Sequence, residues 1–101
     1  MLKANAKIKF TLEGKNYTND NEFRIAFRFA DNLIFSGHVE SDNEVYCANK
    51  EYDVSIQFFT VEDEAYSALT PILSTNDILA MCAGKRILGT ARLLDYEYEE
   101  E

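Results

Sequence analysis

Apolar and polar residues alternate along most of the chain, as in β-strands with one buried face. Residues 3–12 show the pattern first, with the apolar positions Ala4, Ala6, Ile8, Phe10 and Leu12. Strand-like runs follow at residues 23–29, 33–39, 52–58, 76–83 and 87–94, with a shorter apolar piece at 45–47. Polar, turn-rich residues at 13–21 predict a loop. The pattern therefore predicts about six short strands.

Only residues 61–73 break this alternation. Glu62, Asp63 and Glu64 would suit a first helical turn, where the helix dipole favours acids. Ala65 and Leu69 have helical spacing, but Pro71 limits the length. We expect at most a short helical turn near 62–70, which would cap one end of the fold.

Many short strands with turns between them predict an all-β fold, and here a small antiparallel β-barrel. Gly89 and Ala91 lie on the same alternating face of the last strand as Ile87 and Leu93, and a glycine there suggests that another backbone packs close, as at the closing seam of a barrel. We expect Gly89→Val to destabilise the fold for this reason. The expected interior residues are Ile8, Phe10, Phe23, Ile25, Phe27, Val54, Ile56, Phe58, Ile87 and Leu93.

Length and composition fit one small domain. The 101 residues, 47% of them hydrophobic, predict a single barrel over 1–95 and an acidic tail over 96–101. The tail is most simply a frayed end, although a run of like charges can also serve as an interaction tail. No apolar stretch suggests a membrane span or a secretion signal, so we expect a cytoplasmic protein. Cys47 and Cys82 lack metal-type spacing and are expected to be free thiols.

The charge is acidic and uneven. The net charge is −8, and five of the 18 acids lie in the last seven residues. The first 30 residues carry six of the ten basic groups against three acids. Because nucleic-acid affinity comes mainly from neutralised phosphates, the overall charge disfavours tRNA or other RNA as a partner.

The order of these features resembles the C-terminal β-barrel domain of elongation factor Tu and related translational GTPases. The likeness spans nearly the whole chain. It is carried by residues 4–10, Gly14-Lys15, the aromatic and arginine strand 23–29, strand 52–58 followed by Pro71, Asn76-Asp77, and the closing turn and strand at 84–91. The chain departs from the family's pattern in the first loop, at Ile25 in place of a proline, and at Ala91 in place of a glycine. The resemblance implies a barrel whose surface contacts a macromolecular partner, since in elongation factor Tu this barrel helps to hold tRNA and contacts the exchange factor.

The GTPase part of that family is missing. No phosphate-cradling motif of the type Gly-x-x-x-x-Gly-Lys-Ser/Thr occurs in the sequence, so we expect no bound nucleotide and no cofactor.

Residues with catalytic or metal-binding chemistry do not form a recognisable set. His38, the one histidine, has Ser36 and Glu40 on its own strand face, roughly 7 Å away, whereas catalysis needs contacts of about 3 Å. Metal binding by His38 with Glu40 and Asp42 would lack a second histidine or a cysteine. We therefore expect no catalytic residue, no metal and no enzyme.

The remaining set is basic. Lys15, Arg24, Arg28, Lys85 and Arg86 are the candidate partner-binding residues, because in the resembling family the first loop and the closing turn lie towards one rim. The alternative is a scatter of surface charges. Two functions follow as hypotheses: a non-enzymatic binding module with a protein partner, or a small acidic antagonist, such as an immunity-type protein, of a basic toxin or nuclease.

Overall fold

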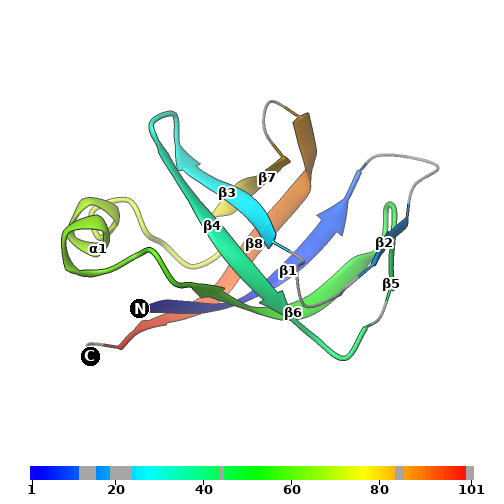
Figure 1. The fold of residues 1–101 in the computed structure, drawn as a ribbon, viewed down its shortest axis with the longest axis horizontal. Coiled ribbons are helices and arrows are strands. Elements are labelled where there is room, and N and C mark those ends of the chain that lie inside the picture. The colour runs from blue at the N-terminus through cyan, green and yellow to red at the C-terminus, as the bar shows by residue number, and fades with distance from the viewer. Residues whose placement is uncertain (12–15, 19–23, 44, 84–85, 100–101) are drawn as a thin grey trace.

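Six antiparallel strands form a closed barrel in the computed structural model, which describes residues 1–11, 16–18, 24–43, 45–83 and 86–99. The strand order is β1-β6-β4-β3-β7-β8, and β8 pairs with β1 to close the barrel. A two-stranded sheet, β2-β5, and one helix, α1, complete the fold (Figure 1). The elements are β1 (Leu2–Phe10), β2 (Asn16–Thr18), β3 (Arg24–Ala30), β4 (Leu33–Glu40), β5 (Val45–Cys47), β6 (Glu51–Phe58), α1 (Asp63–Leu69), β7 (Ile78–Ala83) and β8 (Arg86–Tyr98). The expected all-β barrel with one short helix is confirmed.

The barrel interior is packed by the alternating apolar side chains of each strand. In β1 every second residue is buried, and β6, its neighbour, shows the same alternation. Most of the expected interior residues are buried: Ile8, Phe10, Ile25, Phe27, Val54, Ile56, Phe58 and Leu93. Phe27 and Phe58 meet edge to face, with ring centroids 5.4 Å apart. Apolar burial on this scale is the main stabilising contribution to a domain of this size.

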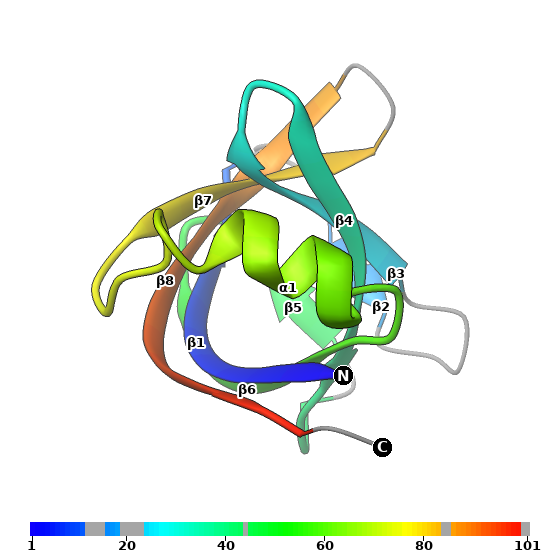
Figure 2. The ribbon, with the colours of Figure 1, turned by 90° about the vertical axis from the view of Figure 1, so that its left-hand side faces the viewer.

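Helix α1 lies across one end of the barrel (Figure 2). Val61 before it and Leu69 at its last turn are fully buried in the core cluster. The helix places Asp63 and Glu64 in its first turn, where the dipole favours them. Thr70 ends it just before Pro71, and the Thr70 hydroxyl donates to the Tyr66 carbonyl oxygen at 2.7 Å. The expected helical cap is confirmed.

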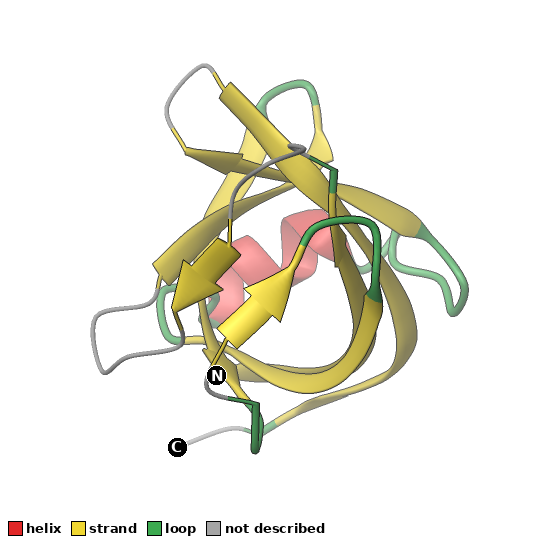
Figure 3. Ribbon diagram, turned by 90° about the vertical axis from the view of Figure 1, so that its right-hand side faces the viewer, coloured by secondary structure: helices red, strands yellow, loops and turns green. Residues whose placement is uncertain are grey.

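The β2-β5 sheet lies at the opposite end (Figures 1 and 3). Tyr46 of β5 is fully buried there, and its ring meets Phe10 at 5.6 Å and Tyr52 at 4.9 Å between centroids. The Tyr52 hydroxyl accepts a hydrogen bond from the Cys47 backbone N–H at 2.8 Å. Strand β2 of this sheet lies within residues 13–21, where the turn-rich sequence predicted only a loop.

Ile87 was wrongly expected inside the barrel. It is 55% exposed, because the β7–β8 register shifts between Met81 and Cys82. Met81 pairs with Gly89 and Cys82 with Ile87, so Leu88 is the extra residue of a β-bulge. A bulge reverses the inside–outside alternation on its far side. Phe23, also expected in the core, lies outside the described residues.

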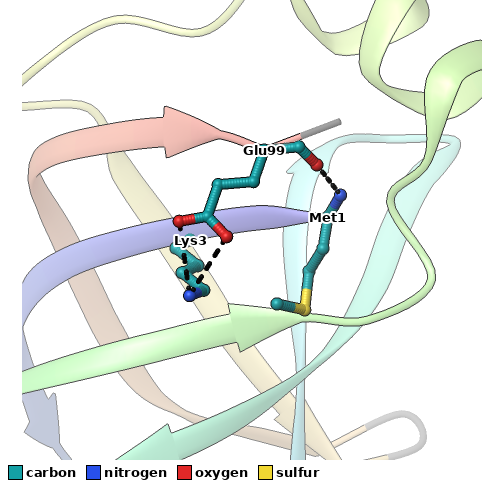
Figure 4. Close-up of polar contacts among 3 residues, drawn as sticks. All are labelled: Met1, Lys3 and Glu99. Atoms are coloured by element: carbon teal, nitrogen blue, oxygen red, sulfur yellow. Dashed lines mark hydrogen bonds and ion pairs between the residues drawn. The ribbon is translucent and has the colours of Figure 1, made fainter. Parts of the chain in front are cut away.

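The expected tail boundary at residue 96 also differs from the structure. Strand β8 continues to Tyr98, which pairs with Leu2. The Met1 ammonium donates to the Glu99 carbonyl oxygen at 2.7 Å, and Lys3 Nζ lies 3.3 Å from a Glu99 carboxylate oxygen (Figure 4). Residues 96–99 therefore belong to the barrel wall and are not a frayed end. Strand β7 begins at Ile78, two residues after the expected start at residue 76.

No helix among the described residues is long and apolar enough to span a membrane.

Candidate partner-binding surface

The polar chemistry of the described residues lies on the outside of the barrel. None of the described polar or charged residues is buried, and the interior is filled by the core cluster. The hollows among the described residues are lined by outer-face side chains. A site for a partner must therefore be sought on the outer wall.

His38 is a half-exposed strand residue. Its Nε2 lies 3.9 Å from a Glu40 carboxylate oxygen, and its ring lies 6.3 Å from that of Phe59. The described residues contain no group of three or more His, Cys, Asp or Glu residues that could hold a metal ion. Cys47 and Cys82 are free thiols, as expected, and Cys82 is buried.

The predicted basic residues are only partly described. Lys15 and Lys85 lie outside the described residues. Arg24 lies in β3 opposite His38, and its side chain is not described. Arg28 is half-buried in β3, and Arg86 is exposed at the start of β8. The two strands that carry Arg28 and Arg86 flank β7, since β3 and β8 both pair with it.

Strand β7 contains no charged residue, and its outward positions are apolar. Ala80 pairs with Arg28 on one side and with Thr90 on the other. Ile78 is 69% exposed and pairs with Arg92 of β8. Apolar side chains thus lie on the outside of the wall between two arginine-bearing strands.

Two further isoleucines extend this apolar area. Ile34 of β4 pairs with Arg28 and is 47% exposed. Ile87 pairs with Cys82, which pairs in turn with Ala26. Residues paired in register point to the same face of a sheet. We call the resulting surface the β3–β7 face, and it comprises Ala26, Arg28, Ile34, Ile78, Ala80, Ile87 and Arg92.

Sequence reasoning singled out only Arg28 of this face and missed the other six members: Ala26, Ile34, Ile78, Ala80, Ile87 and Arg92. The signal for Ile78 was present, because it alternates with Leu79 and therefore faces away from the core. Ile87 could not be found in this way, since only the bulge turns it outward.

The β1–β6 side of the barrel has a different character. Lys7 Nζ lies 3.6 Å from an Asp53 carboxylate oxygen. Asn5 bridges two strands there, donating to Asp95 at 2.8 Å and accepting from the Ser55 hydroxyl at 2.9 Å. This side therefore carries the Lys7–Asp53 ion pair and a carboxylate, Asp95, that is hydrogen-bonded to Asn5.

One tyrosine at the β2-β5 end has a perturbed acidity. Burial raises the pKa of Tyr46 above its ordinary value of 10.0, and the nearby Tyr52 acts in the same direction. The hydrogen bond with the Ser41 hydroxyl, at 2.5 Å, opposes the rise. This group belongs to the packed end of the barrel, so its role is structural.

No protein-family model matches the chain, and no curated protein matches it. The resemblance to the elongation factor Tu barrel stays a prediction.

Proposed function

We propose that the protein is a non-enzymatic binding module that contacts a macromolecular partner through its outer surface, in the manner implied by the elongation factor Tu resemblance. The observation that supports this most is the contrast between the two sides of the wall. Large apolar side chains are exposed on the β3–β7 face, while the β1–β6 side is charged and polar. Exposed apolar patches are typical of interaction sites.

The packed interior supports the same proposal. An eight-stranded barrel is just wide enough for its side chains to fill it, and this barrel has six strands. The α1 end and the β2-β5 end are both occupied by buried side chains. The partner we propose is a protein inside the cell. RNA is disfavoured as a partner because the chain is acidic, and we propose that the protein binds no nucleotide.

The second candidate is a small acidic antagonist of a basic toxin or nuclease. A specific observation favours it beyond the net charge of −8. Carboxylates line two adjoining shallow hollows on the outside of β4, β6, β1 and β8, namely Glu40, Asp42, Asp53, Asp95 and Glu97. Such a surface would complement a basic partner.

Two sets of substitutions in this protein separate these functions, when each is tested for binding to a partner identified by pull-down. The binding module predicts that Lys85→Glu with Arg86→Glu weakens binding, while Glu97→Gln with Glu99→Gln does not. The antagonist predicts that the glutamate changes slow association and the basic changes leave it intact. Deleting residues 97–101 would be a poor test, because it removes Tyr98 from the barrel wall. If neither set changes the affinity, both electrostatic proposals fail.

A further inference from the structure

The charges of the chain are segregated over the barrel wall. All four arginines lie in residues 24–30 and 86–92, and these stretches contain no acid. Residues 33–39 and 78–83, which complete this part of the wall, contain no acid either. The rest of the chain carries six lysines and all 18 acids. The strand segments on one side of a strongly acidic protein therefore carry basic, apolar and uncharged polar residues but no acid, although Asp31, Glu40 and Asp77 directly adjoin them.

No ion pair within the described part of the chain involves Arg28, Arg86 or Arg92. The ion pairs found there join Lys3 to Glu99 and Lys7 to Asp53, and His38 Nε2 lies 3.9 Å from a Glu40 carboxylate oxygen. Arg86 and Arg92 are exposed, and the buried Nε of Arg28 has no hydrogen-bond acceptor. A buried donor without an acceptor is costly, and an arginine that has no ion pair in its own chain can receive a carboxylate from a partner.

The geometry sets the order of the groups. Arg28 and Arg92 lie on the two strands beside β7, with Ala80 and Ile78 between them. Neighbouring strands are about 4.8 Å apart, and the two arginines are also offset by two residues, or about 6.7 Å, along β7. Their backbones are therefore separated by roughly 12 Å across the apolar strip. A matching partner would present apolar side chains with carboxylates on both sides of them.

We propose that the β3–β7 face docks a protein segment that is apolar at its centre and acidic at its flanks. This inference rests on the proposed binding function and names the chemistry of the partner. A nucleic acid fits less well, because a phosphate backbone offers no apolar partner for Ile34, Ile78 and Ile87. Arginine together with large apolar residues is also typical of protein interface cores.

Selection of random peptides from a display library on the whole protein tests this proposal. We expect the enriched peptides to combine Asp or Glu with large apolar residues. Their affinity should fall about tenfold or more on Arg28→Met with Arg92→Glu, since both arginines of the face lose their contacts to the acidic flanks. Lys50→Glu is the matched control, an exposed charge reversal outside the face, and it should change the affinity less than about twofold.

The apolar half of the proposal has its own pair of variants. Ile78→Ser should weaken the peptides severalfold, and Ile72→Ser should not, although Ile72 is 42% exposed as well. Thermal melts of all four variants check that each is folded. A labelled single-stranded RNA is included as a competitor probe.

Several outcomes would overturn the proposal. They are enrichment of basic or uncharged peptides, no enrichment, equal effects of the face and control variants, or RNA binding that the arginine variants abolish. Peptides that bind elsewhere on the barrel would overturn this inference and leave the binding function standing. Absence of both a selected peptide and a pull-down partner would overturn the two together.

Discussion

At the scale of single residues, the two described glycines show how close the packing is. A Cβ at Gly89 would meet the Lys9 carbonyl oxygen, and it would lie 2.8 Å from Phe10 Cα. A Cβ at Gly37 would lie 2.7 Å from Ile56 Cγ2 and from a Phe27 ring carbon. The first obstacle is backbone and the second is side chain, which can move more easily.

We therefore predict that Gly89→Ala destabilises the fold more than Gly37→Ala. The expected loss at Gly89 is about 3 kcal/mol of unfolding free energy, and larger for Gly89→Val, because strand β1 would have to shift. Urea unfolding of the two alanine variants measures the difference. An equal or smaller loss at Gly89 would show that the seam is not tightly closed there.

Tyr46 supplies a prediction on pH. Its pKa is raised in the folded state, so the unfolded state loses its proton first as the pH rises. The contribution of the protonated Tyr46 hydroxyl to the unfolding free energy is complete below pH about 10, and it is lost as the pH rises through the folded-state pKa. Tyr46→Phe should lower the unfolding free energy by about 1 kcal/mol near neutral pH, because the hydrogen bond with Ser41 is lost. Above pH about 10 this variant should lose less stability than the native protein does. Parallel losses in both proteins would refute this assignment.

At the scale of elements, the end of β8 holds helix α1 in place. The Tyr98 ring stacks on Tyr66 of the helix, with centroids 4.0 Å apart and planes at 6°. The Tyr98 hydroxyl also donates to an Asp63 carboxylate oxygen at 2.7 Å. The last residues of β8 therefore stabilise helix α1 over the end of the barrel.

Tyr98→Ala should lower the unfolding free energy by about 2 kcal/mol, because it removes both the stacked pair and the hydrogen bond. Glu97→Ala is the matched control, an exposed residue in the same strand, and should change it by less than about 0.5 kcal/mol. Tyr98→Phe, which keeps the ring, should fall between the two. Similar values for Tyr98→Ala and Glu97→Ala would mean that the C-terminal residues are not part of the folded wall.

Most strands could be predicted because their alternation is regular. β1 and β6 alternate without interruption, and their buried faces follow directly from the sequence. The bulge at Leu88 could not be predicted, since it depends on how β7 and β8 pair, so Ile87 was placed on the wrong side. The tail was misjudged for a related reason: its acids suggested a solvated end, whereas Tyr96 and Tyr98 pack against the core.

The candidate site was predictable only in part. The sequence singled out Arg28 and Arg86, but the pairing of β3 and β8 with β7 is a property of the closed barrel. That pairing brings distant residues such as Arg28 and Arg92 to the same face. Charge counts along the chain concealed this arrangement, because they place the basic excess in the first 30 residues.

At the scale of the whole molecule, the structure is an acidic barrel in which the strand segments of one side carry no acid. The N-terminal strand β1 lies between β6 and the C-terminal strand β8, so neither end of the chain can leave without opening the wall. We therefore expect far-ultraviolet spectra dominated by β-structure and a single cooperative unfolding transition. Two separated transitions would contradict a single closed core.

The central claim is that binding takes place on the β3–β7 face. Its most direct test is the affinity of the native partner, identified by pull-down, for the Arg28→Met with Arg92→Glu variant compared with Lys50→Glu. We predict a loss of about tenfold or more for the arginine variant and almost none for the lysine variant. Equal affinities of the two variants for that partner would contradict the claim.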